Sequence, residues 1–173
     1  MLRGAVTNDT KIYQIALRFI NRAAGNRAPF PFESLGALHV SLTGCAPPLA
    51  AGELVLISAY FSNESWYMFT TRRIVALYGG ILQTIDPAHG IEAEFPNFKG
   101  YEPDAELSKP GTVARDVATI MARGSRALVR FEYETWNGST FPIYAARYWD
   151  VRHPFLEKML LEAEAKDGKF EVD

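Results

Sequence analysis

The sequence predicts an α+β protein in which amphipathic helices flank a series of short antiparallel strands. Three observations lead to this prediction. An apolar stripe at helical spacing lies near the N-terminus, short apolar runs separated by turn residues fill the middle, and a second helical stripe lies near the C-terminus. A chain of 173 residues can bury roughly 70% of its unfolded surface in one core.

The first predicted element is a helix that docks on a sheet. Its apolar side chains recur every three to four residues, at Ile12, Ile15, Ala16, Phe19, Ile20 and Ala23. Asp9 or Thr10 is the expected N-cap and Gly25 the expected stop. A helix lying on a membrane would need a lysine-rich opposite face, and Arg18 and Arg22 make only a weak one.

The middle of the chain predicts strands joined by hairpin turns. The expected strands cover residues 38–42, 54–61, 66–70, 74–78, 81–85 and 92–95. Residues 54–61 are apolar on both faces, which is typical of a central strand. Gly79 and Gly80 predict a tight turn, because glycine adopts positive φ without strain.

The C-terminal third predicts a helix, a hairpin and a final helix. Thr112 would cap a helix that stops at Gly124 and turns four apolar residues inward, Val113, Val117, Ile120 and Met121. Residues 129–134 alternate as a strand, and the Asn137-Gly138 turn would return residues 141–148 as its partner. The last helix begins near Asp150, and its expected inner stripe is Leu156, Met159, Leu160 and Ala163.

Composition and charge are those of an ordinary globular protein. Hydrophobic residues make up 48% of the chain, charged residues 22%, and the formal net charge is −2. No global field would therefore attract nucleic acid or an anionic membrane. The chain has no apolar run of spanning length and no secretory signal pattern, and Cys45 is its single cysteine. We expect a cytoplasmic protein that binds neither nucleic acid nor membrane lipid.

Charged residues are unevenly distributed along the chain. The segment 86–104 is acidic, and the segment 115–130 is mainly basic. These patches would either steer a charged partner or pack beside each other as solvated faces.

The histidines do not form a catalytic pattern. His89 lies near Asp86, Glu92 and Glu94, residue types that could hold a metal or make an acid–base pair if the fold gathers them. Turn chemistry around Pro87 and Gly90 explains the same composition. His39 is expected to be half-buried in a strand, and His153 to serve capping or packing. The zinc, nucleophile-elbow, phosphate-loop and dinucleotide motifs are missing from the sequence, so we expect no metal, no cofactor and no catalytic residue.

The stretch "WYMFTTRRIVALYGG", residues 66–80, raises the question whether Thr70 to Arg73 form a site. The two threonines favour extended backbone because they are β-branched. We expect the segment to form the connection between two consecutive strands. Arg72 and Arg73 are then expected to pair with nearby carboxylates.

Two stretches, "WYMFTTRRIVALYGGILQTI" and "FEYETWNGSTFPIYAARYWDVRHPFLEKML", resemble bacterial pleckstrin-homology-like (PH-like) domains. The first resembles their strand, T-x-x-R-[IL], strand and glycine-turn pattern, and the second their last hairpin and capping helix. The resemblance implies a strongly bent antiparallel β-sheet or barrel capped by a C-terminal α-helix. Residues 29–173 would form this domain, and residues 1–28 an extra N-terminal helix packed on it. The loop "TGCAPPLAAGE" has no basic residue, which argues against lipid-headgroup binding there.

Protein recognition is the function that these observations favour. Phe95, Phe98, Tyr101 and Trp136 fall in predicted loops, where aromatic side chains make good binding anchors, and Glu102 and Asp104 add acidic groups. The same aromatics could instead fold back as a local cluster. An adaptor or an immunity-type protein that blocks a basic partner is one specific form of this hypothesis. The alternative is a small enzyme or ligand carrier that uses the open end of the sheet around His89.

Overall fold

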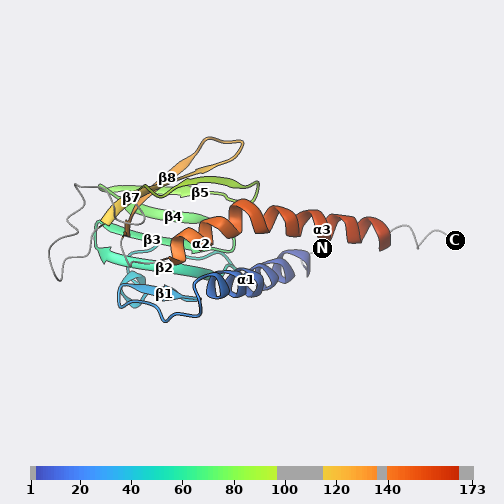
Figure 1. Cartoon of the computed structure of the whole chain (residues 1–173), viewed down its shortest axis with the longest axis horizontal. Coiled ribbons are helices and arrows are strands. Elements are labelled where there is room, and N and C mark those ends of the chain that lie inside the picture. The colour runs from blue at the N-terminus through green and yellow to red at the C-terminus, as the bar shows by residue number, and fades with distance from the viewer. Residues whose placement is uncertain (1–2, 97–114, 136–139, 168–173) are drawn as a thin grey trace.

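The chain folds into two antiparallel sheets with helices at both ends of the sequence, as the computed structural model in Figure 1 shows. The structure describes residues 3–96, 115–135 and 140–167. Helix α1 (Arg3–Ala23) precedes a sheet of β1 (Glu33–Leu35), β2 (Val55–Ser62), β3 (Ser65–Thr70), β4 (Ile74–Tyr78) and β5 (Ile81–Ile85). A second sheet contains β6 (Ile91–Glu94), β7 (Arg115–Ala122) and β8 (Leu128–Glu134). A continuous helical segment then consists of α2 (Phe141–Arg147), a π-helical turn (Tyr148–Arg152) and α3 (His153–Asp167).

The α+β prediction is confirmed, whereas the barrel is not formed by the described residues. In both sheets neighbouring strands are consecutive in sequence and antiparallel. Strand β8 packs against β3, β4 and β5, so the sheets face each other across the core. The described parts of the helices include none that is long and apolar enough to cross a membrane.

Strand β3 lies at the centre of the larger sheet and is buried on both faces. Tyr67 and Phe69 point into the main core, where Phe131 of β8 meets them. Trp66 and Met68 point to the other face, where Leu42 and Val75 complete a smaller cluster. The predicted strands 66–70, 74–78 and 81–85 are confirmed, and Gly79 and Gly80 make their turn with φ of 57° and 75°.

Helix α1 covers the main core with the predicted apolar stripe, since Ile12, Ala16 and Ile20 are all buried. The predicted N-cap is wrong. The helix begins at Arg3, so Asp9 lies inside it and is only 3% exposed. The predicted stop is confirmed, because the helix ends at Ala23 and Gly25 follows with φ of 68°.

Two predicted elements in the middle of the chain are wrong. Residues 115–122 form strand β7 in place of a helix, because Ala118, Ile120 and Ala122 bury one face at the two-residue period of a strand. Residues 38–42 are not a strand, since Val40–Leu42 is a turn of 3-10 helix with His39 as its N-cap. This segment folds over the larger sheet, where Leu42 is fully buried.

The segment 141–148 is helical and does not return as a hairpin partner of β8. Pro142 lies in the first turn of α2, where its missing N–H leaves no hydrogen bond unmade. Phe141, Ala145 and Trp149 are buried and spaced by four residues, so they lie along one helical face. The predicted turn residues Asn137 and Gly138 lie outside the described residues.

Helix α3 projects beyond the sheets, as Figure 1 shows. The inner stripe predicted for it is therefore not buried as expected. Leu156 and Leu160 are half-buried, whereas Met159 and Ala163 are exposed. A helix that leaves the body has no core surface to cover, so its apolar side chains remain in contact with water.

Replacing Phe131 by alanine tests the packing between the two sheets. Its ring lies 4.4 Å from that of Tyr67 and 5.9 Å from that of Phe69, measured between centroids. The resulting cavity should lower the free energy of unfolding by about 3–5 kcal/mol in urea denaturation. Arg130→Ala, on the exposed face of the same strand, is the control and should change it by less than about 0.5 kcal/mol. Equal effects of the two substitutions would contradict this packing.

Candidate functional site

The segment Thr70 to Arg73 forms the connection between β3 and β4 and is built around the side chain of Thr70. The Thr70 hydroxyl donates to the Glu53 carboxylate over 2.7 Å. The backbone N–H groups of Arg72 and Arg73 donate to the same hydroxyl oxygen over 3.1 Å and 3.0 Å. A β-branched residue with a hydroxyl therefore both continues the strand and closes the turn.

Each arginine of this turn forms an ion pair with a carboxylate from another part of the chain. The Arg72 guanidinium donates to Asp9 of α1, with a shortest distance of 2.6 Å. The Arg73 guanidinium donates to Glu53 over 2.8 Å. The Asp9 and Glu53 side chains are only 5% and 1% exposed. The prediction that the arginines pair with carboxylates is confirmed.

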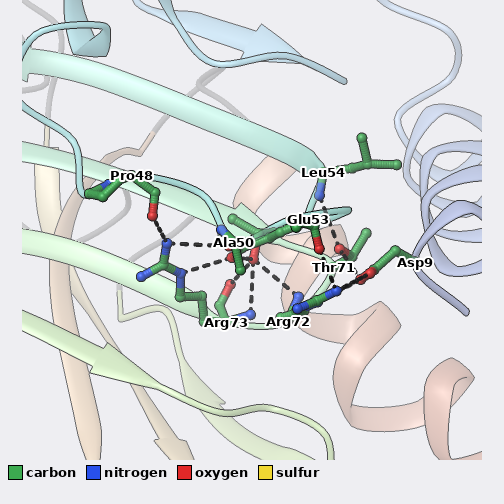
Figure 2. Close-up of polar contacts among 10 residues, drawn as sticks. Asp9, Pro48, Ala50, Glu53, Leu54, Thr71, Arg72 and Arg73 are labelled. Atoms are coloured by element: carbon green, nitrogen blue, oxygen red, sulfur yellow. Dashed lines mark hydrogen bonds and ion pairs between the residues drawn. The ribbon is translucent and has the colours of Figure 1, made fainter. Parts of the chain in front are cut away.

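Further hydrogen bonds complete the two pairs (Figure 2). The Thr71 hydroxyl donates to Asp9 over 2.7 Å, and the Ala50 N–H donates to Glu53 over 2.8 Å. The arginines also bind carbonyl oxygens of the preceding loop, Arg72 that of Ala51 and Arg73 that of Pro48. The buried charges are thus bonded on several sides, which offsets their loss of hydration.

This network also sets the protonation of the two carboxyl groups. Burial raises the pKa of Asp9, but hydrogen bonds from Arg72 and Thr71, with the arginine's charge, outweigh it and hold the pKa below its usual value. Burial likewise raises the pKa of Glu53, and bonds from Arg73, Thr70 and Ala50 hold it below its usual value. Both groups are therefore ionised at neutral pH and available as permanent anchors for the arginines.

A double-mutant cycle on Asp9 and Arg72 tests how strongly the turn holds α1. Arg72→Ala should lower the free energy of unfolding by about 1–3 kcal/mol, because it leaves the buried Asp9 carboxylate without its partner, and Asp9→Ala should lower it by less, because the Arg72 side chain is 39% exposed. The coupling energy should exceed that of the more exposed pair Arg123 and Asp150, for which we expect about 0.2–1 kcal/mol. Urea denaturation at neutral pH measures both cycles, and an equal or smaller coupling for Asp9 and Arg72 would contradict the assignment.

The pH dependence of stability gives a second measure of the same network. The pKa values of Asp9 and Glu53 lie below their ordinary values of 3.8 and 4.5 in the folded chain. The two carboxylates therefore contribute fully to the stability of the fold above their unfolded pKa values, and this contribution is lost as pH falls through their lower folded pKa values. In urea denaturation from pH 6 down to pH 2.5, replacing Asp9 and Glu53 by Asn and Gln should flatten this acid loss. An unchanged acid profile would contradict the lowered pKa values.

Two adjoining cavities lie beside this network, at the start of α3, and we call them together the α3-root groove. The inner cavity measures about 290 Å³, and α1, the β3–β4 turn, the β5–β6 turn and the start of α3 all contribute to its wall. The outer cavity measures about 490 Å³ and lies between the β5–β6 turn and α3. Ala88 and Glu157 line both cavities.

His153 forms part of the wall of the inner cavity and is only 3% exposed. Its Nδ1 lies 3.2 Å from the Tyr148 hydroxyl, and its Nε2 lies 3.2 Å from a Glu157 carboxylate oxygen. Its ring packs on Trp149, with centroids 4.5 Å apart. Burial lowers the pKa of His153, partly offset by Glu157 and Asp86, so the imidazole is neutral at pH 7.

His89 does not form the acid–base pair that the sequence allowed. It is exposed on the β5–β6 turn, and no hydrogen bond or ion pair joins it to another described residue. Asp86 instead accepts the N–H of Ala88 over 2.9 Å, which closes the turn. Within the described ranges, no three His, Cys, Asp or Glu residues are grouped so as to hold a metal ion.

Of the residues predicted to contact a partner, the structure places Phe95. Its half-buried ring packs edge-on against Phe131 and Tyr133, and the Tyr133 hydroxyl donates to the Pro96 carbonyl. The other predicted residues lie outside the described ranges, namely Phe98, Tyr101, Glu102, Asp104 and Trp136.

Glu134, at the end of β8, is only 8% exposed. Burial raises the pKa of its carboxyl to about 7. Arg115 acts against the shift, Glu33 adds to it, and Arg27 acts against it. No hydrogen bond joins the carboxyl to another described residue. Glu134 therefore titrates near neutral pH, and its ionised form destabilises the fold at higher pH.

The raised pKa of Glu134 has a definite sign for stability. The protonated carboxyl contributes fully to the stability of the fold below the unfolded pKa of 4.5, and this contribution is lost as pH rises through the folded pKa of about 7. Glu134→Gln should therefore raise the free energy of unfolding at pH 8 by roughly 1–2 kcal/mol more than it does at pH 4.5, a range that allows for solvent screening. Glu94→Gln, exposed on β6, is the control. A pH-independent effect of Glu134→Gln would contradict the raised pKa.

The sequence carried signals for two contacts of this region that were not predicted, the ion pair of Asp9 and the contact between His153 and Glu157. Asp9 stands at a position that continues the apolar stripe of α1 towards the N-terminus, three residues before Ile12. A carboxylate on such a stripe is expected to find a cationic partner when it is buried. His153 and Glu157 are four residues apart, the spacing at which side chains on a helix meet.

Comparison of the chain with protein-family models, with curated proteins and with solved structures finds no match.

Proposed function

We propose that the chain is a non-catalytic protein-interaction module whose binding surface is α3 together with the α3-root groove. The observation that carries the proposal is the row of large apolar side chains that α3 and the turn before it leave in water. Val151, Phe155, Met159 and Leu161 are 59%, 56%, 52% and 66% exposed. Large apolar side chains gathered along one exposed helical segment are typical of a protein-binding site.

The arrangement of these side chains suits recognition by a complementary surface. Phe155 and Met159 are four residues apart, so they lie on one face of the projecting helix. Leu161 lies on the side of α3 that borders the outer cavity. A partner that covers both sides of the helix would bury all three side chains.

The coarse architecture agrees with the family that two sequence stretches resemble. Two antiparallel sheets followed by a C-terminal helix are what a PH-like domain would have, and we propose that identity for residues 29–173. PH-like scaffolds also host peptide binding, which supports an adaptor or immunity-type role for a cytoplasmic protein. The long projecting α3 departs from a helix that only caps the sheet.

A small-ligand carrier is the second candidate, and the inner cavity is the observation that favours it. Its wall combines apolar, aromatic and ionisable side chains around a concave space, as ligand sites do. At about 290 Å³ it lies at the small end of the range for such sites. The exposed apolar surface of α3 has no role in this alternative, and we therefore place protein binding first.

Site-specific photo-crosslinking in the native cell tests the proposal. A photoreactive residue at Phe155 or Met159 should crosslink to one protein, whereas the same residue at Thr84, exposed on β5, should not. The purified partner should then bind the Phe155→Ser and Met159→Ser double variant at least about tenfold more weakly, since each buried apolar side chain contributes roughly 1.5–3 kcal/mol.

Other crosslinking outcomes are equally informative. Crosslinks only from Phe98 or Tyr101 would keep the interaction function and move the surface to the 95–104 segment predicted from the sequence. Crosslinks to a second copy of the chain would make the surface a self-association site. If none of these positions crosslinks to a protein, the proposed function is contradicted.

A further inference from the structure

The α3-root groove has a charge balance that indicates what enters it. Its walls hold four carboxylates, Asp9, Asp86, Glu157 and Glu162, and two permanent cations, Arg72 and Lys158. Asp9 and Arg72 neutralise each other within the turn network. Three carboxylates then face one ammonium group, and the groove carries an excess of negative charge.

Two of these carboxylates have capacity left for a further partner. One oxygen of Asp86 accepts the Ala88 N–H, and one oxygen of Glu157 meets His153. No hydrogen bond joins the second oxygen of either group to another described residue. Both residues line the inner cavity, Asp86 from the β5–β6 turn and Glu157 from α3. The two carboxylates therefore belong to the wall of one cavity and come from two different elements.

Among the described residues that line the inner cavity, Arg72 is the permanent cation, and it is already paired. Arg72 is held by Asp9 and by the Ala51 carbonyl. The neighbouring imidazole of His153 is neutral at pH 7, because burial lowers its pKa. A cation that enters the cavity would thus gain two charge-assisted interactions without displacing an existing ion pair.

The remaining walls suit the hydrocarbon part of such a ligand. Ile12, Ala88 and Trp149 line the inner cavity, and Pro154, Leu161 and Ala165 line the outer one. Long basic side chains commonly lay their methylene groups along apolar surface while the charged end finds a polar partner. An apolar residue next to the basic one would find space along Leu161 and Ala165.

We propose that the α3-root groove binds a lysine or arginine side chain of a partner protein, with its charged group between Asp86 and Glu157 and a neighbouring apolar residue against Leu161. The inference rests on the proposed function and specifies the partner. The partner presents a basic and apolar segment, in agreement with an immunity-type or adaptor role against a basic protein.

NMR titration of the full chain with small probes tests this chemistry before any partner is known. The probes are Nα-acetyl-lysine methylamide, its arginine counterpart and the uncharged norleucine analogue. The lysine and arginine probes should shift the Trp149 indole and Ala88 amide signals with millimolar affinity, and norleucine should not. Trp66→Phe and Trp136→Phe variants assign the indole signals.

The variant Asp86→Asn with Glu157→Gln should weaken binding of the lysine probe about threefold to tenfold or more, because both charge-assisted contacts are lost. Glu92→Gln with Glu94→Gln removes the same charge from exposed positions of β6 and is the matched control. If the Asp86→Asn and Glu157→Gln variant fails to fold, the salt dependence of lysine binding to the wild-type chain tests the same contacts. Lysine binding must then weaken from 20 mM to 500 mM NaCl.

Equal shifts with lysine and norleucine, or an affinity unchanged by Asp86→Asn and Glu157→Gln, would overturn the inference. The results that would refute the proposed function differ from those that would refute the basic anchor. A partner crosslinked through Phe155 that binds this variant as tightly as the wild type keeps the function and refutes the basic anchor. Lysine binding without any crosslinked protein supports the cation site and refutes the protein-interaction module.

Discussion

The structure depends on keeping two buried carboxylates fully bonded at the β3–β4 turn. Asp9 and Glu53 are removed from water, and each is stabilised by an arginine of the same short turn. Apolar contacts alone would let α1 slide along the core, since hydrophobic packing has little directionality. The bidentate contact of Arg72 with Asp9 is directional, so it fixes where α1 lies against the sheet.

The same turn also shapes the candidate binding surface. Glu53 ends the loop that covers the second face of the larger sheet, and Asp9 and Arg72 form part of the wall of the groove. Because this ion pair is internally neutral, Asp86 and Glu157 determine the charge of the inner cavity. The π-helical turn lies where the helical segment changes from buried to exposed. Beyond this turn, Leu161 of α3 lines the outer cavity together with Glu157 and Glu162.

The sequence predictions succeeded where one local pattern had one structural solution. Strands β3 to β5 followed from apolar runs and two consecutive glycines, and α1 followed from a long stripe. They failed where the pattern fitted two structures. Val117, Ile120 and Met121 suit a helix, but the small residues Ala118 and Ala122 let β7 pack closely between neighbours as a strand. In the segment 141–148 the preceding Asn137-Gly138 pair suggested a strand, whereas Pro142 is accommodated in the first turn of a helix.

By itself the sequence determined the fold class, most of the first sheet and the kind of partner that the two arginines would take. Only the tertiary structure decided which carboxylates those partners are, since Asp9 and Arg72 are 63 residues apart. It also decided that His89 stays in solvent while His153 is buried in the wall of the groove. The physical reason is that side-chain periodicity records which face of an element is buried. The meeting of distant charged groups depends on how whole elements dock, and no local pattern records that geometry.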